Sequence, residues 1–240
     1  MLLMVLAVMA QEEKPNIFVG TFVNKSDASD AACNTLRQEV VSGIVGTNRL
    51  TVVEASSLGN IPKARNERLI YLNEMSIPYY IEGTFNTVDK RKKTSTTGGV
   101  TTTRYEATIS YTLAIIDTET GVTKSSETFT ETSSTSSSAE DAVIKAAGNA
   151  KDRMVRFVDT HFKVDAVIKA LDEVDSKKGV KSCYINVGSN AGIDKGQIFE
   201  VFIMTEIVGE KIEKKIGELR VEEVLSGSLS KCDVKNGGID

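Results

Sequence analysis

The spacing of apolar side chains changes several times along the chain, and each change marks a predicted element. Residues 17–23 form a short apolar run that predicts a β-strand, and residues 50–54 predict another. Between them, apolar positions recur at the spacing of one helical face over residues 29–46. Pro62 suits the first turn of a second helix, whose apolar positions are Leu69, Leu72 and Met75. The chain therefore begins with the order strand, helix, strand, helix.

A period of two residues follows from residue 79 onward. Residues 79–89 predict a strand in which Gly83 marks a bulge or a close approach of the backbone. Residues 90–99 predict a polar connection. Every second side chain of residues 103–117 is apolar, which predicts a strand with one buried face. Residues 122–132 return antiparallel, and because Ser and Thr leave them little apolar area, we place this strand at a sheet edge.

A long helix is predicted to close this region. Ser137 and Glu140 match a capping box, and an alanine-rich apolar stripe continues from there to Phe162. The small alanine side chains allow such a helix to lie close to a sheet. Residues 16–163 therefore predict an α/β (α+β) domain, in which helices pack against a mixed five-stranded sheet.

Residues 165–240 carry only strand patterns. Glycines separate the predicted strands, which lie at 166–174, 183–187, 197–207, 216–224 and 228–234. Closing such a sheet into a small barrel removes its exposed edges. We therefore expect a small all-β, SH3-like barrel as the second domain.

The N-terminal residues 1–10 form a continuous apolar run that is too short to span a bilayer as a helix. Val8 and Ala10 suit the positions three and one residues before a signal-peptidase cut. We expect a signal peptide with an incomplete n-region, since no Lys or Arg precedes the run; a buried N-terminal strand is the alternative. The protein is then exported to the periplasm, and outer-membrane association stays open. No other run reaches about 18 apolar residues, so no transmembrane helix is expected.

Composition argues against several classes of function. The formal net charge is −4 and no basic stripe is present, which argues against a nucleic-acid partner. Multi-histidine metal sites lack their side chains, because the only histidine is His161, and no nucleophile motif lies beside it to indicate a catalytic triad or a Cys–His pair. We expect no enzyme, with no catalytic residue, cofactor or metal site, although a mechanism that uses carboxylates alone stays open. His161 ends the predicted helix, where it suits the negative end of the helix dipole.

Three cysteines are present. Cys33 falls on the apolar face of a predicted helix, where a small core residue is the ordinary interpretation. Cys183 and Cys232 both fall in the C-terminal β region and are candidates for a disulfide if the protein is periplasmic.

Several segments of the first domain resemble the curli-secretion (CsgG-like) family of envelope proteins. They are IFVGTFVN at 17–24, IPYYIEG at 77–83, LAIIDTETG at 113–121 and the alanine-rich closing helix. Ile77 and Pro78 replace the Ala-Asp that opens the second of these motifs in the family. The resemblance implies an anticodon-binding-domain-like fold, and relatives of that domain occur in secretion channels, in activators of cell-wall synthases and in flagellar envelope proteins. Residues 186–201 resemble the small C-terminal barrel of flagellar and envelope assembly proteins.

The function expected from these features is a non-catalytic role in envelope assembly or secretion, in which the chain binds envelope proteins, cell-wall components or further copies of itself. One alternative is a subunit of an oligomeric outer-membrane secretion channel, and another is a protein similar to cell-wall synthase activators. A carboxylate-dependent hydrolase is a third, different class. The candidate partner surface joins the edge-strand residues Thr128 and Thr130 to a basic cluster, Lys90, Arg91, Lys92 and Lys93, which is otherwise a solvated hairpin tip.

Overall fold

The structure is a computed structural model that describes residues 14–175, 179–208 and 210–237. The signal peptide predicted at residues 1–10 lies outside this part of the chain. The chain divides into two compact units, one holding residues up to 154 and the other residues from 155 onward together with 46–49. The predicted domain limits of 16–163 and 165–240 stay predictions.

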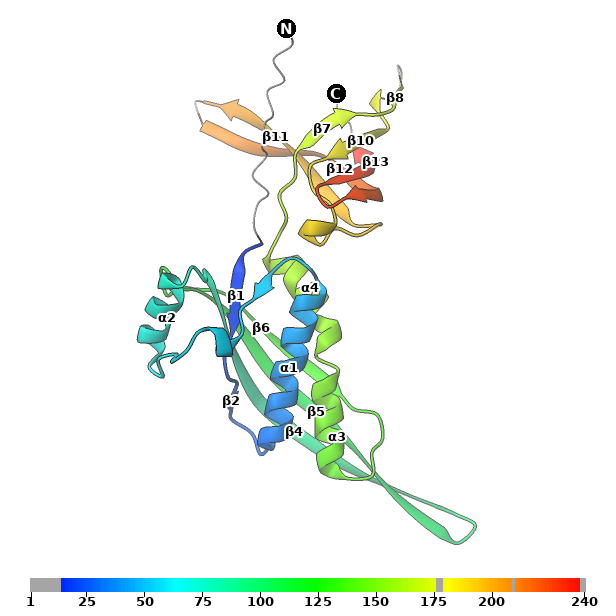
Figure 1. The fold of residues 1–240 in the computed structure, drawn as a ribbon. Helices are drawn as coiled ribbons and strands as arrows, with labels where there is room; N and C mark the ends of the chain where they lie inside the picture. The colour runs from blue at the N-terminus through cyan, green and yellow to red at the C-terminus, as the bar shows by residue number, and fades with distance from the viewer. Residues whose placement is uncertain (1–13, 176–178, 209, 238–240) are drawn as a thin grey trace. The chain divides into compact units, whose positions relative to one another are not determined.

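A mixed sheet forms the first unit, as predicted (Figure 1). Its strands are β1 (Asn16–Val19), β2 (Val23–Asn24), β3 (Thr51–Val52), β4 (Tyr79–Thr97), β5 (Val100–Asp117) and β6 (Thr123–Thr132). The order is β3-β1-β4-β5-β6, and the short β2 pairs with β4. The N-terminal strands pair in parallel, whereas β4, β5 and β6 pair antiparallel. The edge position predicted for β6 is confirmed.

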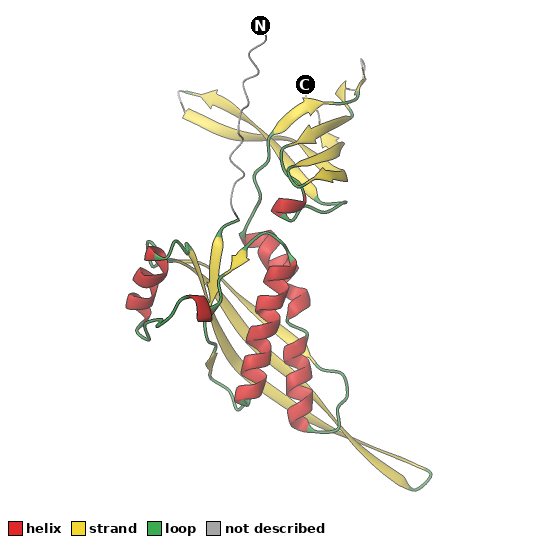
Figure 2. Ribbon diagram, viewed as in Figure 1, coloured by secondary structure: helices red, strands yellow, loops and turns green. Residues whose placement is uncertain are grey.

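Helices cover the two faces of this sheet to different extents (Figure 2). They are α1 (Asp30–Gly46), α2 (Arg65–Glu74), α3 (Ala139–Gly148) and α4 (Lys151–His161), with a short 3-10 helix at Ala55–Ser57. Helices α1 and α3 lie over one face. Helix α2 packs on one end of the other face, where Leu69 and Leu72 meet Tyr80. The assignment of Met75 to the apolar face of α2 is wrong, because the helix ends before it and its side chain is exposed.

An apolar core lies between the sheet and the helices α1 and α3, which cover one of its faces. Alternate side chains of β5 are buried, as the period of two predicts: Ala107, Ile109, Tyr111, Leu113 and Ile115. Leu36, Val40 and Ile44 of α1 follow helical spacing and are fully buried. Burying one such Leu or Ile side chain stabilises the fold by about 1.5–3 kcal/mol. The periodicity of β5 and α1 therefore determines which face of each element carries the core.

The first strand differs from its prediction. The sequence predicts one strand over residues 17–23, but the structure divides it into β1 and β2. In the gap, the N–H of Gly20 donates to the carbonyl of Ile81 at 3.0 Å. The buried ring of Phe22 lies against the backbone of Gly83, where an added Cβ would be 2.2 Å from Phe22 Cε1. Gly83 is thus a point of close approach, one of the two roles that the sequence predicts for it.

The polar connection predicted at residues 90–99 is wrong, because β4 and β5 continue as one hairpin. Thr97 pairs with Val100 across a two-residue turn. Gly98 and Gly99 have φ angles of 58° and 81°, and a type I′ turn requires positive φ at both of these positions. Successive threonines favour extended backbone, so the ladder continues although the side chains here are polar or exposed.

The long helix predicted to run to Phe162 is interrupted. Helix α3 ends at Gly148 with Asn149 as its C-cap, and α4 begins at Lys151. Gly and Asn are both weak helix formers. Asn149 also forms a hydrogen bond outside the helix, because its Nδ2 donates to the carbonyl of Thr132 at 2.9 Å. The chain is therefore bonded to the end of β6 at the point where the helix ends.

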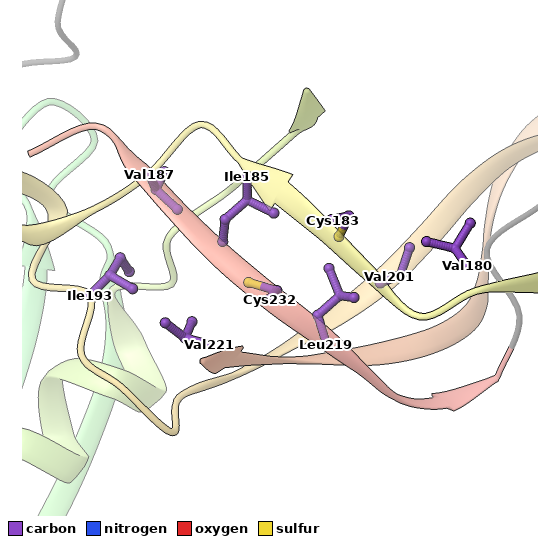
Figure 3. Packing of buried hydrophobic residues seen from close by; sticks show 9 residues of the cluster. All are labelled: Val180, Cys183, Ile185, Val187, Ile193, Val201, Leu219, Val221 and Cys232. Atoms are coloured by element: carbon purple, nitrogen blue, oxygen red, sulfur yellow. The ribbon is translucent and has the colours of Figure 1, made fainter. Parts of the chain in front are cut away.

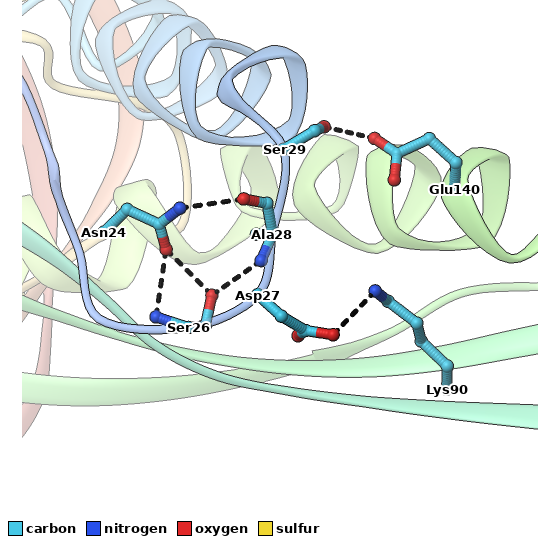
Figure 4. Close-up of polar contacts among 7 residues, drawn as sticks. All are labelled: Asn24, Ser26, Asp27, Ala28, Ser29, Lys90 and Glu140. Atoms are coloured by element: carbon cyan, nitrogen blue, oxygen red, sulfur yellow. Dashed lines mark hydrogen bonds and ion pairs between the residues drawn. The ribbon is translucent and has the colours of Figure 1, made fainter.

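The start of α3 lies one residue later than the capping box predicts. Ser138, not Ser137, is the N-cap, and its Oγ accepts from the N–H of Asp141 at 3.1 Å. The carboxylate of Glu140 instead accepts a hydrogen bond from Oγ of Ser29, which lies at the start of α1 (Figure 4). The glutamate thus links two helices instead of capping its own.

The second unit is built around a five-stranded antiparallel sheet that is curled into a half barrel. Its strands are β7 (Ile168–Leu171), β10 (Ser182–Ile185), β11 (Ile198–Ile207), β12 (Glu210–Ser226) and β13 (Leu229–Gly237). The order is β11-β12-β13-β10-β7, so the predicted closure is not complete, since β7 and β11 do not pair within the described residues. Beside it are a two-stranded sheet and a 3-10 helix, formed by β8 (Val174–Asp175), β9 (Gly179–Val180) and Ser189–Ala191.

One face of the half barrel carries its apolar core (Figure 3). Cys183 and Ile185 of β10, Leu219 and Val221 of β12, and Cys232 of β13 are all buried. Within β10 and β12 these residues are two positions apart, so each strand turns one set of side chains toward the core. The strands predicted around these positions are present in the structure.

Acid is expected to weaken the half barrel through Glu218. Hydrogen bonds from Lys215 and then Asn236 hold the pKa of Glu218 down at about 2. A carboxyl whose pKa is lower in the folded than in the unfolded chain contributes stability above its unfolded pKa of about 4.3, and loses it as the pH falls toward the folded value. The free energy of opening of β12 and β13, obtained from amide exchange rates corrected for the intrinsic pH dependence of exchange, should therefore fall between pH 5 and pH 2 in the parent chain. In Glu218→Gln this pH dependence should be weaker, whereas Glu213→Gln, which removes another exposed carboxylate of β12, should retain it; equal slopes in all three would contradict the role of Glu218.

Candidate partner-binding surface

The sheet of the first unit has a polar face opposite α1 and α3. Because side chains alternate along a strand, the residues between the buried positions of β5 point to this face, together with their neighbours on β4 and β6. We name it the Ser/Thr face, and it consists of Thr84, Asn86, Thr108, Ser110, Thr112, Ser126, Thr128, Thr130 and Thr132. All of these residues are half-buried or exposed.

Hydrogen bonds across the strands order the Ser/Thr face. Asn86 Nδ2 donates to Thr112 Oγ1 at 2.8 Å, and Thr112 Oγ1 and Thr128 Oγ1 are also 2.8 Å apart. Thr108 and Thr132 form a similar pair at 3.2 Å. These bonds connect β4, β5 and β6 by their side chains as well as their backbones. The face is therefore a preorganised array of hydroxyl groups, which can both donate and accept hydrogen bonds.

Helix α2 covers only one end of this side of the sheet. There the strands present Phe18, Tyr80 and Ile116 to the helix. Beyond that end nearly all outward side chains are polar, so they offer a helix little apolar area to bury. The boundary between covered and open sheet thus follows the side chains of the strands.

The last strand, β6, is firmly held on one side and open on the other. Phe129 stacks on Tyr111 with ring centroids 5.2 Å apart, and buried Glu131 accepts from Arg153 Nε at 2.8 Å. Among the described residues no strand pairs with the outer edge of β6. An ordered strand with an open edge is a template for strand addition.

The four basic residues of the predicted surface do not form one patch. Register places Arg91 opposite Glu106 and Lys93 opposite Arg104 on the side of the Ser/Thr face. Lys90 and Lys92 point to the helix-covered side, because they lie opposite the inward positions 107 and 105. Only half of the cluster therefore shares a face with Thr128 and Thr130.

Most of these basic side chains are also paired. Lys90 Nζ lies 3.0 Å from Asp27 Oδ2, Arg91 Nε 2.9 Å from Asp89 Oδ2, and Lys93 Nζ 2.7 Å from Glu106 Oε1. Lys92 has no ion-pair partner in the described part of the chain. Exposed pairs of this kind contribute little energy, but they reduce the positive charge that the hairpin offers to an anionic partner.

Lys90 has a structural role in the loop between β2 and α1 (Figure 4). Its hydrogen bond holds the pKa of Asp27 below the ordinary value. In the same loop Asn24 Nδ2 donates to the carbonyl of Ala28 at 2.8 Å, and Asn24 Oδ1 accepts from the N–H of Ser26 at 3.0 Å. These contacts indicate that Lys90 helps to anchor the loop against β4.

The half barrel has an exposed apolar segment in β11 that is not among the predicted site residues. Phe202, Ile203 and Met204 of β11 are exposed by 47%, 42% and 61%. Adjacent residues of a strand point to opposite faces, so this part of β11 is apolar on both. The sequence does contain the pattern, because residues 201–204 are four consecutive apolar side chains that break the alternation.

The described residues contain no cluster typical of a metal site. No group of three or more His, Cys, Asp or Glu side chains within them could hold a metal ion.

A shallow groove of about 730 Å³ is lined by residues that include Asp194, Glu222 and Glu223, but all three carboxylates are exposed. His161 lies with its ring centroid 4.9 Å from that of Phe157 at the end of α4. Within the described residues no helix is both long and apolar enough to cross a bilayer.

Comparisons with known proteins identify structural likenesses only. No family model and no curated protein matches the chain. PelC from Paraburkholderia phytofirmans, solved as a dodecamer, is 14% identical with a TM-score of 0.36, over 59% of this chain and 87% of that one. The LpoB C-terminal domain from Escherichia coli is 10% identical with a TM-score of 0.37, over 52% and 87%. Lipoprotein GNA1162 from Neisseria meningitidis is 14% identical with a TM-score of 0.37, over 61% and 99%. At these TM-scores no functional conclusion follows, and the CsgG-like resemblance stays a prediction.

Proposed function

We propose that this chain is a non-catalytic protein of the cell envelope that binds another envelope protein through the Ser/Thr face and the open edge of β6. The observation that carries the proposal is an ordered, hydroxyl-lined sheet face that ends in an unpaired strand edge. A partner strand would pair with the backbone of β6, and its side chains would contact the hydroxyls of Thr128 and Thr130. Export of the chain rests on the apolar run at residues 1–10.

The edge favours strand addition for two reasons. The strand is fixed before a partner arrives, because Phe129 and Glu131 are buried beneath it, so little ordering entropy is lost on binding. Outward-pointing Lys side chains commonly protect edges from unwanted pairing. The central outward positions of β6, at 126, 128 and 130, are Ser or Thr, so no lysine protects this part of the strand, and its inward-pointing charge, Glu131, is paired with Arg153.

Substituting both Thr128 and Thr130 with Lys is expected to weaken partner capture about tenfold or more, because charged side chains oppose strand addition. The measurement is capture of partners by the purified mature chain from its own envelope extract, quantified by mass spectrometry against the parent chain. Asn60→Lys with Asn66→Lys is the matched control, since both positions are exposed and the added charge is the same. Equal capture by the two double variants would show that the surface is wrong.

Three further measurements separate this proposal from its alternatives. A photoreactive residue at Thr130 should cross-link a protein, whereas the same residue at Asn66 should not. Membrane fractionation with single-channel conductance tests the alternative of a channel subunit. Loss of a hydrolytic activity on replacing one Asp or Glu would instead support an enzyme.

A further inference from the structure

Cys183 and Cys232 are direct cross-strand neighbours. In the antiparallel pairing of β10 with β13, Cys183 is the register partner of Cys232, between the pairs Ser182–Asp233 and Tyr184–Lys231. Directly opposed residues of antiparallel strands have Cα atoms about 4.5–5.5 Å apart. Disulfides join Cα atoms about 4.4–6.8 Å apart. The backbone of this sheet therefore already has a separation that a disulfide accepts.

The two side chains also share an environment. Opposed residues of an antiparallel pair point to the same face, and both cysteines are fully buried in the half-barrel core beside Ile185 and Leu219 (Figure 3). Both are free thiols in the structure. Rotation of the side chains is the movement that bond formation needs, because the strands pair without a register shift at this position.

We propose that Cys183 and Cys232 form a disulfide that joins β10 to β13 in the core of the half barrel. The oxidant is a second disulfide, which reacts by thiol–disulfide exchange. One thiolate attacks a sulfur of the oxidant and forms a mixed disulfide, while the other oxidant sulfur leaves as a thiolate. The second cysteine, as its thiolate, then displaces the remaining oxidant sulfur. Two S–H bonds and the oxidant S–S bond are broken, one new S–S bond forms, and two electrons and two protons pass to the oxidant.

Burial determines when this exchange can occur. Desolvation raises the pKa of Cys183 to about 11 and that of Cys232 to about 12, and only the thiolate attacks a disulfide. The folded half barrel therefore holds the thiols in an unreactive form and excludes the oxidant. The disulfide therefore forms during folding, after the two strands have paired and before the core has closed around them.

The third cysteine supplies an internal control. Cys33 is buried in α1, a helix of the other unit. It therefore has no cross-strand neighbour with which to form a disulfide. After the full mature chain is refolded with oxidised glutathione, denaturing alkylation should label one thiol per chain, and peptide mapping should place it at Cys33. The oxidised half barrel should melt roughly 10 °C above the form treated with dithiothreitol, since the bond closes a loop of about 50 residues in the unfolded chain.

The results expected from the proposal differ clearly from those that would contradict it. In Cys33→Ala, which leaves the pair intact, no free thiol should remain after oxidative refolding. The fully folded, reduced chain should oxidise at least about a hundredfold more slowly than the refolding chain, as the scarcity of thiolate implies. Three free thiols after oxidative refolding, or a bond from Cys33 to either partner, would overturn the proposal. These results do not depend on partner capture, so the proposed function is tested separately.

Discussion

Replacing Gly188 with alanine is expected to lower the free energy of unfolding of the half barrel by about 3 kcal/mol. An added Cβ would lie 2.1 Å from the carbonyl oxygen of Ser226 and 2.9 Å from the nitrogen of Leu229. Both are backbone atoms that flank the turn between β12 and β13, so no side chain can rotate away. Backbone conformation is not the cause, because φ at Gly188 is −155° and any residue adopts it.

Denaturant unfolding followed by amide exchange in β12 and β13 would measure this loss. Gly148→Ala is the control, since an added Cβ there meets no atom of the described residues within 4 Å and alanine favours helix. A loss no larger in Gly188→Ala than in Gly148→Ala would contradict the steric argument.

A second large effect is expected at Gly83, where alanine should destabilise the α/β unit by about 2 kcal/mol. The new Cβ would lie 2.2 Å from Cε1 of Phe22, whose ring is only 7% exposed. The ring must therefore leave its place against β4, and the break between β1 and β2 loses its anchor. The effect should be smaller than at Gly188, because a side chain can move where a backbone cannot.

A double-mutant cycle isolates the contact between Gly83 and Phe22. Phe22→Leu shortens the side chain over Gly83, so Gly83→Ala should cost less in that background than in the parent chain. The coupling should reach about 1 kcal/mol, as is typical of residues in contact. Additive losses, measured by urea unfolding of all four chains, would show that the clash is relieved in another way.

The parts of the fold with a clear apolar period could be predicted from the sequence. Residues 103–117 alternate over their whole core segment, and the buried residues of β5 follow that alternation. The Ser/Thr composition of residues 122–132 correctly placed β6 at an edge, because a strand with little apolar area cannot be buried on both faces.

The missed parts have polar or mixed patterns. Residues 90–97 contain no apolar alternation, so nothing in the period of their side chains indicated a strand; backbone pairing extends it instead. The informative feature was Gly98-Gly99, a dipeptide typical of a two-residue hairpin turn. Once the strand is extended, a period of two separates Lys90 and Lys92 from Arg91 and Lys93. The division of the basic cluster follows from the same missed element.

The helix break and the half-barrel curl depend on tertiary contacts. Asn149 ends α3 through a bond to Thr132, seventeen residues away in the chain, and local propensity does not contain that bond. Closure of the second sheet depends on whether its two edge strands, β7 and β11, pair with each other. No local pattern in the sequence determines this. Register is equally non-local, so the sequence could name Cys183 and Cys232 but could not place them opposite each other.

The length of the β4–β5 hairpin has a mechanical consequence. Beyond Tyr105 the two strands pair only with each other, from Lys93–Arg104 to Thr97–Val100. The side chains of these outer pairs are not buried, so this part of the hairpin resists bending less than the part from Ala107 and Ile109 inward, where the core starts. A sideways force from an object bound at Gly98 and Gly99 would therefore bend the outer hairpin before it disturbs the helices.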